Sequence, residues 1–148
     1  MAARITSGAT APPQSFISIV RLVWVGPLTV LASIAAVLTV RLFVVALLRP
    51  PAEFTALGIE SPVMLTGALV TCAVLVFVLV ARFTRTPIRT FRTISFGALL
   101  LSFVPDLAVP GSHAPGANWP SAVALMTMHV AAWAVCVGML TTLTRTGR

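Results

Sequence analysis

Three ionisable side chains lie within or beside long apolar stretches of the chain: Arg41, Asp106 and His129. A charge at the centre of a bilayer costs about 3 kcal/mol on insertion scales, and such residues usually face the inside of a helix bundle. At about 1.5 Å per helical residue, Arg41 lies roughly 10 Å from its helix end and His129 about 12 Å into its own helix. Asp106 follows another apolar stretch. All three are therefore predicted in the same half of the membrane, the outer half.

These residues leave three interpretations open. In the first, Arg41 reaches outward to the membrane interface and Asp106 belongs to a solvated loop. In the second, the two residues form an ion pair. In the third, Arg41, Asp106 and His129 line a polar pocket that opens outward. We expect His129 to be a neutral imidazole bonded to a neighbouring helix, for example to Ser102 or a carbonyl, with proton relay or ligand contact as the alternative.

Other chemistry is less well supported by the spacing of the residues. Met126, Met128, His129 and Cys136 suggest copper(I), which prefers thioether and thiolate ligands. Residues two apart point to different sides of a helix, however, and the sequence has no second Met–His cluster. Ser102 lacks the glycines of a hydrolase nucleophile elbow. We therefore expect no metal, no other cofactor, no catalytic residues and no enzymatic activity.

Long apolar stretches must position these residues. The 148 residues are 58% hydrophobic and 9% charged, whereas a soluble domain has roughly 45–50% apolar and about 25% charged residues. Four stretches approach or exceed the roughly 20 residues that a membrane span needs, with Pro105 expected to end the third. The sequence predicts an all-α membrane protein, a four-transmembrane-helix bundle in residues 16–144 with cytoplasmic tails at 1–15 (disordered) and 145–148. The predicted spans are 22–48, 62–81, 88–104 and 121–143.

The most basic stretch sets the orientation. Four arginines fall within eleven residues where the second span ends and the third begins, and short loops rich in Arg stay in the cytoplasm. The acids Glu53, Glu60 and Asp106 then fall outside, where Arg49 is the single arginine. The sequence thus predicts a multi-pass protein of the cytoplasmic membrane with both termini inside, and anionic-lipid contact at the inner surface. The arginines expected at that surface are Arg82, Arg85, Arg89 and Arg92.

Small residues within the spans are expected at helix–helix contacts of the bundle, because small side chains let backbones approach closely. Cys72 and Cys136 lie deep in apolar stretches, so we expect buried cysteines that act as small hydrophobes and form no disulfide. The small residues are Ala32, Ser33, Ala35, Ala36, Gly67, Thr71, Gly97, Ala131, Ala134 and Gly138.

Two stretches carry a resemblance to known proteins. The first is Arg89-Thr90-Phe91-Arg92 leading into Ala98-Leu99-Leu100-Leu101-Ser102-Phe103-Val104-Pro105, and the second runs from Ala124 to Ala132. Together they resemble a family of small four-helix bacterial membrane proteins classed only as a domain of unknown function. The resemblance covers roughly residues 17–144 and is most specific in the second half. It implies four spans and no assigned activity, so it supplies no site residues.

The net charge of +7 does not indicate a nucleic-acid partner, because the arginines are spread between apolar spans rather than along one basic face with aromatics. The sequence favours a non-enzymatic accessory or interaction subunit that contacts the lipid bilayer and a membrane-protein partner, or forms a homo-oligomer. The alternative is a small transporter or ligand-binding protein that uses an outward-facing pocket of Arg41, Asp106 and His129.

Overall fold

The computed structural model describes residues 19–51 and 53–144, which fold entirely into helices and their connections. This confirms four helices that are long and apolar enough to cross a membrane. Both predicted tails lie outside the described residues. The long helices are α1 (Ile19–Leu48), α2 (Glu60–Phe83), α3 (Pro87–Ala108) and α4 (Trp119–Leu143), and the short 3-10 helices are η1 (Thr55–Leu57) and η2 (Val109–Gly111).

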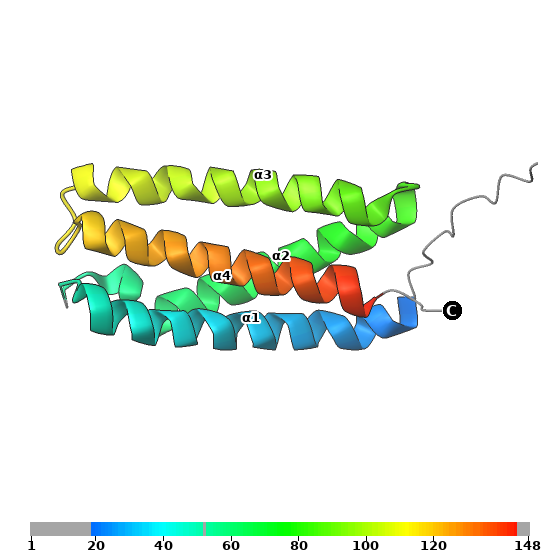
Figure 1. The fold of residues 1–148 in the computed structure, drawn as a ribbon, viewed down its shortest axis with the longest axis horizontal. Coiled ribbons are helices and arrows are strands. Elements are labelled where there is room, and N and C mark those ends of the chain that lie inside the picture. The colour runs from blue at the N-terminus through cyan, green and yellow to red at the C-terminus, as the bar shows by residue number, and fades with distance from the viewer. Residues whose placement is uncertain (1–18, 52, 145–148) are drawn as a thin grey trace, which may run out of the picture.

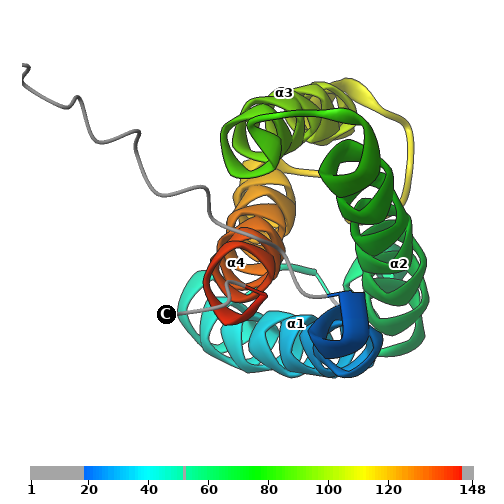
Figure 2. The same cartoon turned by 90° about the vertical axis from the view of Figure 1, so that its right-hand side faces the viewer.

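The long helices lie side by side along the long axis of the molecule (Figure 1). Seen end-on, they form a ring in which α4 lies between α1 and α3 (Figure 2). The α1–α2 connection (49–59) and the α3–α4 connection (109–118) lie together at one end, which we call the loop end. The short turn Thr84–Thr86 between α2 and α3 lies at the other end, which we call the hairpin end.

The helix boundaries follow from proline and polar residues, with one exception. Pro87 is the first residue of α3, as predicted, because a proline there loses no helical hydrogen bond. Pro105, however, does not end α3, which continues to Ala108. A proline within a membrane helix removes one backbone bond, which neighbouring helices and local adjustments compensate. Asp106 consequently lies in the last turn of α3 and is buried, rather than in a solvated loop.

The buried side chains form two clusters, one toward each end. The hairpin-end cluster includes Phe77 of α2 and Phe91 of α3, whose rings meet edge-to-face with centroids 4.9 Å apart. The loop-end cluster contains Val37, Phe54, Leu57, Ala124 and Met128. Two of its members come from the α1–α2 connection. That connection is therefore part of the core and not only a loop.

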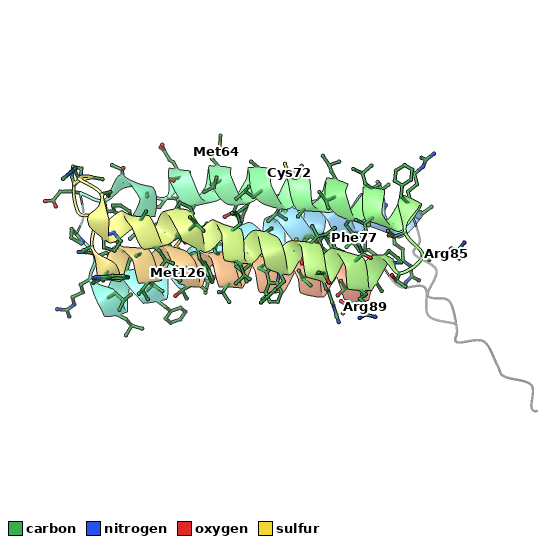
Figure 3. The ribbon with its side chains drawn as sticks, turned by 90° about the horizontal axis from the view of Figure 1, so that it is seen from above. Met64, Cys72, Phe77, Arg85, Arg89 and Met126 are labelled. Atoms are coloured by element: carbon green, nitrogen blue, oxygen red, sulfur yellow. The ribbon has the colours of Figure 1, made fainter. Side chains whose placement is uncertain are left out.

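The outer surface is apolar on all four helices, as expected of a surface that faces lipid. Trp24, Met64 and Leu101 are each at least 70% exposed. Figure 3 shows Met64 and Cys72 pointing away from the bundle. Cys72 is thus exposed, which corrects the expectation that both cysteines are buried, whereas Cys136 is buried in the hairpin-end cluster.

Some small residues lie where they were not expected. A Cβ atom added at Gly97 or Gly138 would meet no heavy atom within 4 Å, so both glycines face outward rather than into the bundle. Gly26 and Gly67 behave differently, because their added Cβ atoms would lie 3.2 Å from Val74 and 3.7 Å from Ile34. Close helix approach within the bundle therefore occurs between α1 and α2 at these two glycines.

Candidate functional site

A carboxylate–imidazole pair joins α3 to α4. The Nδ1 atom of His129 lies 2.7 Å from Oδ2 of Asp106, and the two side chains are 23% and 6% exposed. Asp106 is supplied by the last turn of α3. His129 lies ten residues after Trp119, about 15 Å along α4 at 1.5 Å per residue, so the imidazole lies well inside the apolar span.

The chemistry of this pair follows from its proton donors and acceptors. If Asp106 is ionised, its carboxylate can only accept, and the Nδ1–H of His129 is then the donor of this contact. In a neutral ring, Nε2 is then left as an acceptor. The pair fixes the tautomer of the imidazole and leaves one nitrogen able to accept a proton or a hydrogen bond.

Two further polar contacts connect the same two helices. The indole Nε1 of Trp133 donates to Oγ of Ser95 at 3.3 Å, and a guanidinium nitrogen of Arg92 donates to Oγ1 of Thr141 at 3.4 Å. Arg92, Ser95 and Asp106 share one face of α3, because fourteen residues correspond to almost four whole turns. Polar pairs therefore run along the α3–α4 contact from the hairpin end toward the loop end.

Arg41 does not join this pair. Its Nε donates to the main-chain carbonyl of Leu57 at 2.6 Å, and among the described residues it forms no ion pair with Asp106. Leu57 is the last residue of η1, so Arg41 holds the α1–α2 connection against α1. The structure thus brings together two of the three predicted residues and leaves the third apart.

The partner of His129 also differs from the expected one. Ser102 donates to the carbonyl of Leu99, within its own helix, and Asp106 takes the place that Ser102 was expected to fill. The two methionines considered as soft-metal ligands differ in burial, since Met128 is buried and Met126 is half-buried. Within the described ranges, no group of three or more His, Cys, Asp or Glu residues could hold a metal ion.

The loop end contains residues that sequence reasoning missed. Asn118 accepts hydrogen bonds from the backbone N–H and the hydroxyl of Ser121, and that hydroxyl also contacts the carbonyl of Gly116 at 3.0 Å. Gly116 has a φ of 73° and approaches the backbone nitrogen of Phe54 closely. An Asn three residues before a Ser, with a proline between them, was a signal for this helix start.

The four arginines predicted at the inner surface lie in the α2–α3 turn and in the helix ends beside it, and all four side chains are exposed. Their contact with lipid stays a prediction. Figure 3 shows Arg85 and Arg89 at this end of the bundle. An open hollow of about 380 Å³ lies beside them on α3. It is lined by Thr86, Arg89, Thr90, Thr93 and Ile94.

Comparisons with models of protein families, with curated proteins and with solved structures found no match. The resemblance to a bacterial four-helix family remains a prediction.

Proposed function

We propose that this chain is a multi-pass protein of the cytoplasmic membrane that acts as a non-enzymatic interaction subunit, binding a helix of another membrane protein. Its orientation would place the hairpin end and both termini in the cytoplasm. The asymmetry of the arginines supports this orientation, because Arg82, Arg85, Arg89 and Arg92 are all exposed at the hairpin end.

One observation carries the interaction role: an outward-facing surface of small residues on α4. Ala134, Gly138 and Thr142 follow at four-residue intervals and are exposed, and no heavy atom lies within 4 Å of a Cβ added at Gly138. Glycine costs about 1 kcal/mol relative to alanine inside a helix. In membranes, small residues at four-residue spacing let a second helix approach closely. Within the described bundle the carbonyl of Gly138 accepts a hydrogen bond from the hydroxyl of Thr142, but no other helix packs against its Cα. This open position supports the approach of a helix from outside the chain.

The polar residues also favour an interaction subunit over the alternative, a transporter or ligand-binding protein. That alternative needs Arg41 to share a pocket with Asp106 and His129, whereas Arg41 is bonded to Leu57. The half-buried imidazole of His129 is the one feature that still favours it. The transporter or ligand-binding alternative predicts that candidate anions raise the thermal stability of the wild-type protein and do not raise that of Arg41→Leu.

Site-specific photo-crosslinking in native membranes tests the interaction role. A crosslinker at Ala134 should give a discrete product, and the same group at Met64 on α2 should give none. Gly138→Leu should abolish the product without unfolding the protein, because the position is open. Gly97→Leu on α3 is the matched control and should leave the product intact.

The mass of the product distinguishes a second copy of this chain from a different protein. Equal crosslinking from Ala134 and Met64, or a product that survives Gly138→Leu, would contradict a helix-binding role for this face.

A further inference from the structure

We infer that the outward face of α3 at the hairpin end is a binding site for one anionic phospholipid, with the phosphate beside Arg89 and an acyl chain along the apolar part of the same face. The inference rests on the proposed membrane insertion and orientation, but not on the proposed partner helix. Such a site is more specific than a general attraction between basic residues and a membrane, because it binds one lipid at a defined place on α3.

The polar part of the site is the hollow of about 380 Å³ at the start of α3. Its lining residues follow one another at intervals of three, one, three and one, which places them on a single helix face. Arg89 is exposed, and a guanidinium can donate two parallel hydrogen bonds to phosphate oxygens. A phosphate in the hollow would therefore have a charged, geometrically suited donor.

Two hydroxyls in the hollow are available as additional donors. Thr86 precedes α3 without capping it through its side chain, and Thr90 donates its backbone N–H to Thr86 while its hydroxyl has no partner among the described residues. Thr93 differs, because its hydroxyl already donates to the carbonyl of Arg89 at 3.2 Å. Thr86 and Thr90 can thus bond a headgroup without breaking a bond within the protein.

The same face of α3 becomes apolar farther from the hairpin. Ile94, Leu101 and Val104 are 46%, 70% and 62% exposed, and Gly97 lies between them with open space around it. A glycine among larger apolar side chains leaves a shallow channel along the helix. The order from charge to hydroxyls to apolar surface matches the order from phosphate to acyl chain in a phospholipid.

Charge decides between anionic and zwitterionic lipids. The three acidic residues of the chain, Glu53, Glu60 and Asp106, lie in or near the loop end, in the connection, the first residue of α2 and the last turn of α3. The hairpin end therefore carries arginines without acidic residues to neutralise them. This favours a lipid with net negative charge over one whose headgroup also carries an ammonium group.

Native mass spectrometry of the detergent-solubilised full chain tests this site with two probes, phosphatidylglycerol and phosphatidylcholine. Wild-type protein should retain one phosphatidylglycerol in preference to phosphatidylcholine. Arg89→Gln should lower its occupancy about fivefold, the effect expected of one interfacial arginine. Thr90→Val should also lower it, and Gly97→Leu should do so by filling the channel.

Arg85→Gln is the matched control, because Arg85 belongs to the same basic turn but does not line the hollow. It should change occupancy less than Arg89→Gln. Equal effects of the two variants, or equal retention of the two lipids, would overturn a defined site. Inorganic phosphate separates the ligand sources: if it displaces the lipid and Gly97→Leu has no effect, the hollow binds free phosphate and the lipid proposal fails.

The partner role and the lipid site can fail separately. Gly138→Leu lies on α4 and should leave phosphatidylglycerol binding unchanged, and Arg89→Gln should leave crosslinking from Ala134 unchanged. Thermal unfolding of each variant in detergent, expected to match wild type, shows that lost lipid does not result from lost fold.

Discussion

The two ends of the bundle are built differently. At the loop end, the two connections pack on each other, with Gly116 against Phe54, and Arg41 bonded to the carbonyl of Leu57. At the hairpin end, a turn of three residues contains Arg85, and the ends of the flanking helices carry further exposed arginines, among them Arg89 of α3.

The difference between the two ends suggests different roles: the loop end in stability and the hairpin end in binding. Polar groups shielded from water must find partners within the protein, and the pair of Asp106 and His129 does so toward the loop end. Arginines at a membrane surface have no such requirement and can meet phosphate groups from outside the chain. We therefore expect substitutions toward the loop end to affect unfolding, and substitutions of the hairpin arginines to affect lipid binding.

The largest expected effect is at the Asp106–His129 pair. Asp106→Leu leaves the Nδ1–H of a half-buried imidazole without its partner, which costs about 1–3 kcal/mol. His129→Leu should cost at least as much, because it leaves a buried carboxylate unpaired. The double variant should recover part of the loss. Thermal unfolding in detergent measures all three, and strictly additive losses would mean that the pair does not stabilise the bundle.

A second double-mutant cycle, at Arg41 and Asp106, is the matched control for the first. Arg41 and Asp106 do not pair with each other, so the effects of Arg41→Leu and Asp106→Leu should add. Arg41→Leu is itself expected to destabilise, because it leaves the carbonyl of Leu57 without its donor. Strong coupling between these two residues would instead support the Arg41–Asp106 ion pair, one of the three interpretations that the sequence left open.

A smaller loss is expected at Gly116. Its φ of 73° lies in the left-handed region, and an added Cβ would lie 3.0 Å from the backbone nitrogen of Phe54. Gly116→Ala should therefore cost about 1–2 kcal/mol from the backbone conformation and loosen the packing of the two connections. Protease sensitivity of the loop end and the unfolding temperature report on this. Unchanged values for both would show that the connections do not depend on each other.

The smallest expected effect is at Ser33. Its hydroxyl is fully buried on α1 and has no hydrogen-bond partner within the described part of the chain. Removing an unpartnered buried hydroxyl relieves a desolvation cost, so Ser33→Ala should leave the unfolding temperature unchanged or raise it slightly. A clear fall in the unfolding temperature would indicate that the hydroxyl of Ser33 forms a hydrogen bond when the protein is in the membrane. The hydrogen-bonded polar pairs described above would then not be the full set.

Much of the fold could be predicted because its signals are local. Apolar length defines a span, proline at a first helical position marks the start of α3, and a run of arginines marks a turn between spans. Each signal depends on residues close together in the chain. The end of α3 is less local, because α3 continues past Pro105 and its last turn brings Asp106 against His129 from another helix.

The candidate site could be predicted only in part. Counting residues gives the depth of Arg41, Asp106 and His129 but not which helices are neighbours. The ring order places α4 between α1 and α3 (Figure 2), so Asp106 contacts the histidine of α4 before it can reach the arginine of α1. Gly138 was expected to face into the bundle but faces outward, because helix rotation, which counting residues does not give, decides which way a small residue faces.

The proposed orientation places the two ends of the bundle on opposite sides of a membrane, with the hairpin end in the cytoplasm. Single cysteines at Thr86 and Ser112 test it, since both positions are exposed and the native Cys72 and Cys136 can first be replaced by serine and alanine. With a membrane-impermeant thiol reagent, Ser112→Cys should be labelled in intact cells, and Thr86→Cys only after the cells are opened. Labelling of Thr86→Cys in intact cells would contradict the proposed orientation, and labelling of both would contradict the claim that the bundle crosses the membrane with its two ends on opposite sides.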